Sequence, residues 1–208
     1  DIPVGPTAKV RSHAAALSLQ SLLEKVAAEF GLKVLSLVTD GTQPVGRGIG
    51  PTLEARDILD VLRNDPDAPA DLADRACLIA GALLELVGKA NPGAGKAMAL
   101  DVLHSGVAYT KFEAICRAQG GFRQPTLATH SRPVLAPAPG RVTAIDNRCL
   151  ARVAKLAGAP GDKTAGLDLH VRLGDRVKAG QPLYTLYTET PGELAYAIDY
   201  VMANPDII

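Results

Sequence analysis

Two carboxylates follow a glycine-rich loop in the first third of the chain. The loop places Gly46, Gly48 and Gly50 at alternate positions, and Glu54 and Asp57 stand three residues apart in the segment that follows. Side chains at this spacing are neighbours on a helix surface, and a carboxylate in the first turns of a helix can fold back over the preceding loop. Together with loop carbonyls it offers the oxygen ligands that a hard cation prefers. Two ordinary surface acids are the alternative interpretation.

The glycine loop itself also allows two interpretations. Glycine reaches positive φ at little cost, so such a loop can turn amides or carbonyls toward a small ion. The same spacing is typical of a tight turn in which backbones pack closely. An apolar run precedes the loop, and Pro51 and Thr52 open a helix after it, since proline is well tolerated in a first helical turn. Strand, loop and helix in this order are a common way to build a site in an α/β protein.

Lys9 is a second candidate for binding. It comes just after the turn at residues 3–7, which leaves the first predicted strand. Ligands of open α/β sheets bind at the carboxyl ends of strands, and a lysine there can contact a phosphate or a polar base edge as a point charge. A solvated lysine is the alternative. The four histidines are scattered and have no spaced cysteine or carboxylate partner that would indicate a triad or a metal site.

Apolar spacing predicts the elements that position these groups. A helix over residues 12–30, capped by Ser12 and ended by Gly31, joins a first strand to a buried strand over residues 33–39. Two strands joined by a helix form a βαβ unit with a parallel pair. Further helices are predicted over residues 52–62, 71–87, 95–103 and 110–119. The helix over residues 71–87 is so rich in alanine and leucine that we expect it in the core.

The sequence pattern changes near residue 123, from predicted helices to a proline-rich stretch and short strands. A proline-rich stretch over residues 125–139 leads to an alternating strand over residues 140–146 and an apolar strand over residues 167–173. Residues 174–187 predict two short strands around a tight turn, and residues 193–202 a final helix. We therefore expect an α/β fold over residues 1–122, followed by a small α+β module over residues 123–208.

Composition excludes several functions. The chain has 208 residues, 22 basic and 22 acidic, so its net charge favours neither nucleic acid nor an anionic membrane. No apolar run is long enough to span a bilayer. Three cysteines without ligand spacing indicate reduced, mostly buried thiols in a cytoplasmic protein, with neither a disulfide framework nor a zinc site.

Residues 39–57 carry a resemblance to a known family. They read Thr-Asp-Gly-Thr-Gln-Pro-Val-Gly-Arg-Gly-Ile-Gly-Pro-Thr-Leu-Glu-Ala-Arg-Asp. This resembles the Thr-Asp-x-x-Gln-Pro-x-Gly-x-x-x-Gly-x-x-x-Glu-x-x-Glu/Asp segment of the thymidine/pyrimidine nucleoside phosphorylases. Residues 1–5 are similar to the Asp-x-x-x-Gly strand end of that family, and residues 118–121 and 140–186 fit it as well. The sequence of these segments most resembles the branch of the family that contains AMP phosphorylases and bacterial proteins called putative thymidine phosphorylases.

The resemblance implies a phosphorolytic pentosyltransferase. In such a reaction inorganic phosphate, the co-substrate, attacks the anomeric carbon of a nucleoside and displaces the base, for thymidine as thymine with 2-deoxyribose 1-phosphate. No further cofactor is expected beyond a mono- or divalent cation. The resemblance also implies a homodimer with substrates bound between a helical and an α/β domain.

The resemblance assigns few site residues to this chain. It implies a C-terminal portion in which the phosphate-binding, base-binding and catalytic groups precede Asp1, so the chain alone is expected to be inactive. Lys9 matches a lysine that binds the nucleotide in AMP phosphorylases. Val45 and Gly48, through their carbonyls, and Asp57, through its carboxylate, match a structural cation site, with aspartate in place of the commoner glutamate.

Three functions therefore stand open. The first is a thymidine phosphorylase, and the second is an AMP phosphorylase, which Lys9 favours. The third belongs to another class, a non-catalytic structural module. The C-terminal module is similar to a lipoyl or biotinyl hammerhead but lacks the Met-Lys-type acceptor, so no covalent cofactor is expected.

Overall fold

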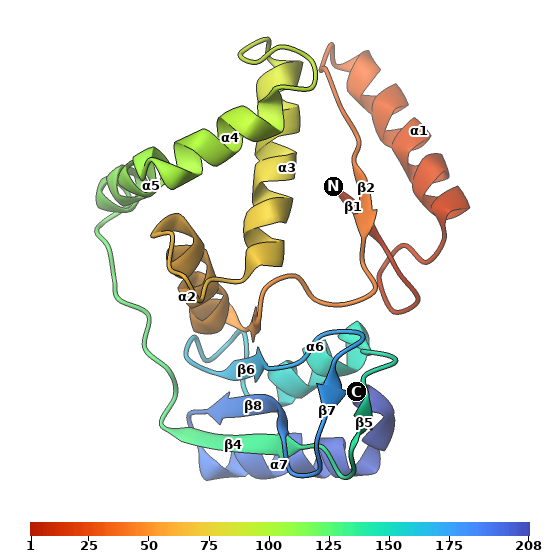
Figure 1. Ribbon diagram of the computed structural model, residues 1–208, viewed down its shortest axis with the longest axis vertical. Helices are drawn as coiled ribbons and strands as arrows, with labels where there is room; N and C mark the ends of the chain where they lie inside the picture. The colour runs from red at the N-terminus through yellow and green to blue at the C-terminus, as the bar shows by residue number, and fades with distance from the viewer. The chain divides into compact units, whose positions relative to one another are not determined.

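The structure is a computed structural model that describes residues 1–208 (Figure 1). The chain forms two compact units. The first consists of Asp1–Val45 and Leu59–Phe122, and the second of Gly46–Ile58 and Arg123–Ile208. The glycine loop and the start of the following helix thus belong to the second unit. The division into domains at residues 122 and 123 stays a prediction, since compact units alone do not define domains.

The first unit opens with a βαβ arrangement. Strand β1 (Ile2–Val4) pairs in parallel with β2 (Val38–Asp40), and helix α1 (His13–Glu29) connects them. The side chain of Ser12 accepts a hydrogen bond from the Ala15 N–H and caps α1, as predicted. The predicted parallel pair is therefore confirmed.

The prediction of a buried strand over residues 33–39 is largely wrong. Only Val38–Asp40 is a strand, and Val34 and Leu35 are 42% and 51% exposed. The register places Ile2 of β1 opposite Val38, so the pairing with β1 covers only Val38–Asp40. An apolar β-branched run has strand propensity, but a strand needs a neighbour to satisfy its backbone groups.

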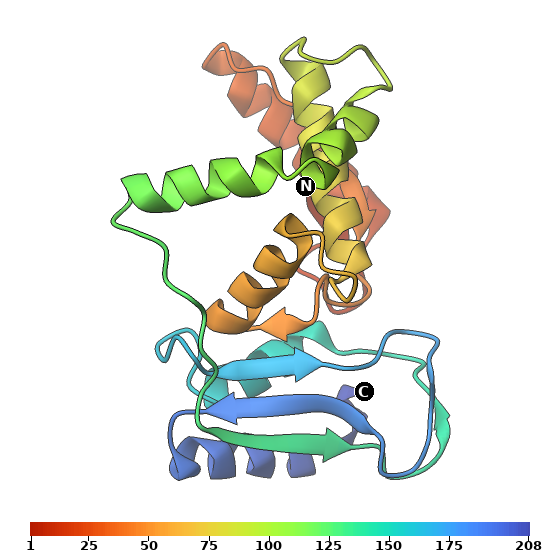
Figure 2. The same cartoon turned by 60° about the vertical axis from the view of Figure 1, so that its left-hand side comes forward.

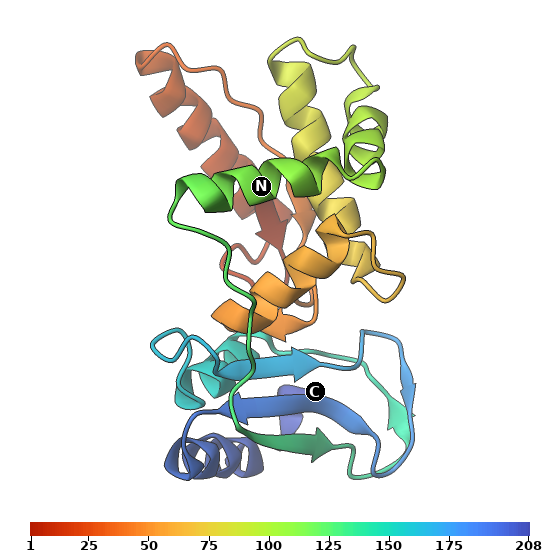
Figure 3. The same cartoon turned by 90° about the vertical axis from the view of Figure 1, so that its left-hand side faces the viewer.

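Three helices complete the first unit (Figure 3): α3 (Ala70–Leu86), α4 (Gly95–His104) and α5 (Val107–Ala118). Helix α3 contacts α4, which contacts α5. The expectation of a core helix at residues 71–87 is only partly met, since α3 buries Cys77 and Gly81 but leaves Leu83 57% exposed. A helix that is apolar all round still buries only the face that finds a neighbour.

The thiols are free, as predicted, although only Cys77 is fully buried; Cys116 and Cys149 are half-buried. Burial raises the pKa of the Cys77 thiol. This favours the neutral, unreactive form.

The second unit is built on a four-stranded antiparallel sheet of order β3-β6-β8-β4. Its strands are β3 (Gly48–Ile49), β6 (Gly166–Leu169), β8 (Pro182–Thr188) and β4 (His130–Leu135). Strands β5 (Gly140–Arg141) and β7 (Arg176–Val177) form a separate ribbon. Figure 2 shows β6, β8 and β4 side by side with helix α7 (Pro191–Ala203) along them, and a short 3₁₀ turn (Pro205–Ile207) ends the chain.

Helix α6 (Asn147–Leu156) was not predicted, and the predicted strand over residues 140–146 is reduced to Gly140–Arg141. Asp146 ends the extended segment because its carboxylate accepts hydrogen bonds from the Arg148 and Cys149 N–H groups and caps α6. Leu150 and Val153 of α6 are fully buried in the core of this unit. The sequence does contain a signal for α6. Asp146 is a suitable N-cap, and apolar residues follow it at spacings of three and four.

The fold class expected from the sequence is confirmed. A parallel βαβ arrangement with further helices precedes an antiparallel sheet with two covering helices, α6 and α7. None of the helices is long and apolar enough to cross a membrane.

Candidate functional site

The carboxyl ends of β1 and β2 lie side by side in the first unit. The Gly41 N–H donates to the Val4 carbonyl at 2.9 Å. A Cβ on Gly5 would collide with the Gly41 carbonyl, so the two backbones touch only because residue 5 is glycine. Two loops therefore leave the pair from one tightly packed point.

Lys9 lies on the first of these loops, residues 5–10, and its side chain is exposed. The loop closes on itself, because the Gly5 N–H donates to the Val10 carbonyl at 3.2 Å and the Ala8 N–H to the Gly5 carbonyl at 3.1 Å. The sequence placed Lys9 at the carboxyl end of a parallel strand, and it is there. Its role as a substrate contact stays a prediction.

Asp40 fixes the second loop. Its carboxylate accepts hydrogen bonds from the Thr42 N–H at 2.9 Å and from the Thr42 hydroxyl at 3.1 Å. Such an aspartate turn is a common way to start a loop after a strand. The Thr-Asp pair of the sequence motif thus has a structural use at the end of β2.

Arg75 of α3 is a residue that sequence reasoning missed. Its guanidinium contacts the Asp1 carboxylate at 3.3 Å, the Thr39 hydroxyl at 2.9 Å and the Asp40 carbonyl at 2.8 Å. The Thr39 hydroxyl in turn donates to Asp1 at 2.6 Å. Since Arg75 lies 74 positions from Asp1 in sequence, no local pattern could have indicated this contact.

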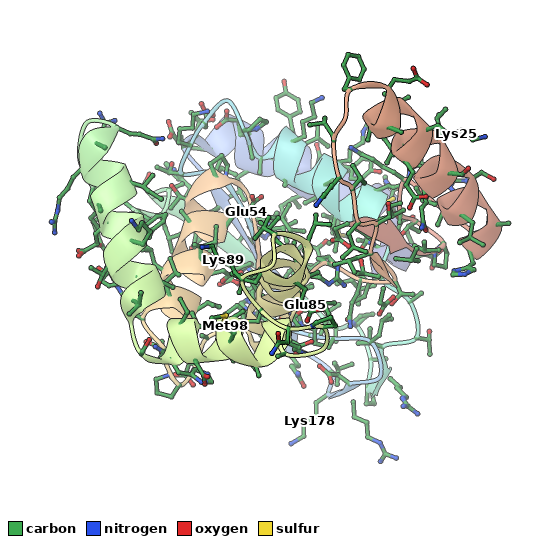
Figure 4. All side chains as sticks on the ribbon, turned by 90° about the horizontal axis from the view of Figure 1, so that it is seen from above. Lys25, Glu54, Glu85, Lys89, Met98 and Lys178 are labelled. Atoms are coloured by element: carbon green, nitrogen blue, oxygen red, sulfur yellow. The ribbon has the colours of Figure 1, made fainter.

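The carboxylate pair after the glycine loop lies in the second unit, on helix α2 (Pro51–Leu62), which carries Glu54 (Figure 4). Asp57 is 4% exposed, and its Oδ2 accepts hydrogen bonds from the Arg47 N–H at 2.6 Å and the Gly48 N–H at 2.8 Å. Glu54 accepts from the Gly50 N–H at 3.0 Å. Both carboxylates fold back over the loop, and both bind its amides.

The glycines of this loop support the packing interpretation. A Cβ on Gly48 would collide with the backbone of Leu53, and one on Gly50 with the carbonyl of Ala165. Gly50 also has φ of +133°, a region that side-chain-bearing residues rarely adopt. The spacing therefore serves close backbone contact within the second unit.

The predicted cation site is only partly described by this geometry. Gly48 and Asp57 lie in the second unit and Val45 in the first, so the arrangement within the second unit concerns only the two former residues. One carboxylate oxygen of Asp57 already accepts two amide hydrogens, and no group of three or more His, Cys, Asp or Glu side chains suits a metal ion. Carbonyl oxygens and one carboxylate still suit a hard cation, and the site at Val45, Gly48 and Asp57 stays a prediction.

Two further arginines anchor this loop region within the second unit. Arg56 pairs with Asp168 of β6 at 2.6 Å, and Arg172 donates to the Gly46 carbonyl at 2.7 Å. Burial lowers the pKa of Arg56, but the hydrogen bond and charge of Asp168 outweigh it and raise the pKa. The other oxygen of Asp168, Oδ1, is buried without a hydrogen-bond partner. Neither contact had a signal in the sequence.

Residues 141–207 match the family described as the pyrimidine nucleoside phosphorylase C-terminal domain. This stretch of the chain is similar to that domain. This C-terminal domain contains α6, β6, β7, β8 and α7, together with the turn that carries Lys178 (Figure 4).

The similarity extends beyond the C-terminal domain to the whole chain. The chain is 59% identical over 208 residues to the "Putative thymidine phosphorylase" of Sphingopyxis alaskensis, 58% to that of Tolumonas auensis and 55% to that of Legionella pneumophila strain Corby. All of this chain is covered, and it spans 40%, 41% and 40% of these relatives, respectively. The family resemblance seen in the sequence is thereby confirmed.

Proposed function

We propose that the protein to which this chain belongs is a pyrimidine nucleoside phosphorylase that cleaves thymidine with phosphate. The observation that carries the proposal is the identity of 55–59% over all 208 residues to proteins named "Putative thymidine phosphorylase". The C-terminal domain at residues 141–207 supports the same family.

The reaction forms a bond between a phosphate oxygen and C1′ of the sugar and breaks the bond from C1′ to the base nitrogen. The bonding electrons leave with the base, which is neutralised by a proton, and the products are thymine and 2-deoxyribose 1-phosphate. The transition state carries positive charge on the sugar, so catalysis needs phosphate held in position and the leaving base stabilised. We propose that these groups come from the part of the protein outside this chain.

This chain then supplies the strand-end loop with Lys9 and the loop held by Asp57. We expect the 208-residue chain alone to be inactive. We further propose a homodimer in the cytoplasm, with phosphate as co-substrate, no organic cofactor and a cation at Val45, Gly48 and Asp57.

The second candidate function is phosphorolysis of AMP. The exposed Lys9 at the carboxyl end of β1 favours it, because an ammonium group on a strand-end loop suits a 5′-phosphate. This function keeps the same chemistry and changes only the substrate.

The test is release of free base by the full-length protein from thymidine, uridine and AMP, each with phosphate. Lys9→Ala is compared with Lys25→Ala, which removes an exposed lysine from α1 of the same unit (Figure 4). Cleavage of thymidine or uridine, with an unchanged KM in both variants, supports the first function. Preference for AMP, with KM raised about tenfold or more by Lys9→Ala alone, supports the second, since a lost contact to a charged group costs that much. Inactivity on all three substrates overturns both functions.

A further inference from the structure

The parallel pair at the candidate site is short. Strands β1 and β2 have three residues each, and the register runs only from Ile2 opposite Val38 to Val4 opposite Asp40. Parallel pairs are less stable per residue than antiparallel ones and are normally buried in a larger sheet. Side-chain contacts to both strands can therefore help to fix the point from which the Lys9 loop leaves.

Arg75 is placed to do this. Its side chain is 17% exposed and that of Asp1 is 23% exposed, so the ion pair between them is largely shielded from water. The guanidinium reaches the residue before β1 through Asp1 and two positions of β2 through the Thr39 hydroxyl and the Asp40 carbonyl. One side chain of α3 thus joins both strands.

The position of Asp40 is passed on to the Lys9 loop through the backbone. Gly41 follows Asp40 directly and donates to the Val4 carbonyl, and its own carbonyl lies against Gly5 with no room for a Cβ. Gly5 begins the loop, and its N–H closes the loop on the Val10 carbonyl. A shift at Asp40 must therefore move Gly5 and the loop that carries Lys9.

We propose that Arg75 is a positioning residue that holds the Lys9 loop in its substrate-binding conformation. It contacts no reacting atom and acts only through the ends of β1 and β2. The effect on substrate rests on the second candidate function, in which Lys9 contacts the substrate, whereas the effect on the loop does not.

The proposed role requires the guanidinium group of arginine, and a positive charge alone at position 75 is not enough. Guanidinium presents about five N–H donors in a rigid planar fork, whereas the ammonium of lysine is a compact point charge. Lysine at position 75 can keep the charge near Asp1 but cannot reach Asp1, Thr39 and the Asp40 carbonyl together. Arg75→Lys is therefore expected to restore only part of what Arg75→Gln removes.

The experiment uses the full-length protein with Arg75→Gln and Arg75→Lys. Arg63→Gln is the matched control, because Arg63 belongs to the same unit and its guanidinium contacts the ring and hydroxyl of Tyr109 and neither strand. The first readout is hydrogen exchange at the Gly5, Ala8 and Gly41 amides, which are hydrogen-bonded within the loops. The second readout is the steady-state kinetics of base release, from which KM and kcat are determined separately.

We expect exchange at these amides to be about tenfold faster in Arg75→Gln and unchanged in Arg63→Gln, since the anchored loop opens more often. We expect KM for AMP to rise about tenfold with kcat within about threefold of the wild type, and Arg75→Lys to lie between, because a displaced lysine loses a charged contact. If Arg75→Gln fails to fold, Thr39→Val removes the hydroxyl that accepts from Arg75 and donates to Asp1, and should shift both readouts in the same direction.

Two results overturn the inference. One is unchanged exchange in a folded Arg75→Gln protein, and the other is faster exchange with an unchanged KM for a substrate whose KM is raised by Lys9→Ala. If the wild-type protein releases no base from any substrate, the proposed function fails, and the exchange rates still decide whether Arg75 positions the loop.

Discussion

Helices α1 and α6 start in the same way and end up in very different surroundings. Ser12 caps α1 and Asp146 caps α6, each through its side-chain oxygen. In α6 the residues Leu150 and Val153 are fully buried, whereas Leu22 of α1 is 58% exposed. Helix α1 faces a two-stranded sheet, whereas α6 belongs to a unit with a four-stranded sheet and a second covering helix. Caps thus act locally, while burial depends on how many elements a unit supplies.

The largest expected effect tests this difference in burial. Leu150→Ala should lower the free energy of unfolding of the 208-residue chain by about 3 kcal/mol, because a fully buried leucine leaves a cavity. Leu22→Ala, on the exposed face of α1, should cost about 0.5 kcal/mol or less. Urea unfolding followed by circular dichroism measures both. A similar cost for both variants would mean that α1 is covered in solution, and the comparison would then be wrong.

The close backbone packing of the glycine loop predicts the next effect. Gly48→Ala should cost about 3 kcal/mol, since its Cβ would meet the backbone of Leu53 and force the loop to shift. Gly140→Ala is the control, because a Cβ there meets open space. Equal melting temperatures for the two variants would contradict a tightly packed loop.

Asp57 predicts a smaller loss. Asp57→Asn removes the charge from an oxygen that accepts two amide hydrogens, and should cost about 1–2 kcal/mol. Asp101→Asn, at an exposed position of α4, should cost almost nothing. The same urea titration measures both, and a neutral Asp57→Asn would argue that the loop is held by other contacts.

The caps should behave alike in the two units. Ser12→Ala in α1 and Thr190→Ala in α7 should each cost about 1 kcal/mol, because each removes one oxygen that accepts an N-terminal amide. Hydrogen exchange at the Ala15 and Glu193 amides reports the loss at each helix. A much larger effect in α7 would show that burial, and not the local bond, sets the value of a cap.

The smallest effect is a pH dependence near the start of α7. Hydrogen bonds from Thr190, and one with Asp162, lower the pKa of Glu193 from its usual 4.5, while the bond with Glu193 raises the pKa of Asp162 from its usual 3.8. Because its pKa is lowered on folding, Glu193 stabilises the fold above pH 4.5. This stabilisation is lost as the pH falls through the pKa of Glu193 in the folded state. Because its pKa is raised on folding, Asp162 stabilises the fold below pH 3.8. This stabilisation is lost as the pH rises through the pKa of Asp162 in the folded state.

Glu193→Gln should therefore lower Tm slightly at pH 7 and lose this effect in acid. Asp162→Asn should raise Tm slightly at pH 7, where it removes a like charge, and have no such benefit below pH 3.8. Thermal melts between pH 3 and pH 7 test both signs. A Glu193→Gln variant that raises Tm at pH 7, or an Asp162→Asn variant that lowers it, would contradict the interaction between the two carboxyl groups.

The sequence by itself determined those features that depend on neighbouring residues. The cap at Ser12, the helix opening at Pro51 and the placement of Lys9 after β1 all follow from local rules, and the motif at residues 39–57 identified the family. The fold of Glu54 and Asp57 back over the glycine loop was also within reach, because it spans a few helical turns.

Only the tertiary structure decided contacts between distant positions. The extent of the strand at residues 33–39 follows from its pairing with β1, and the contact of Arg75 with Asp1 joins residues 74 positions apart. The pair of Arg56 with Asp168 spans 112 positions. Local propensity states what a segment can form, whereas backbone and charged groups are satisfied only by the partners that the whole chain brings to them.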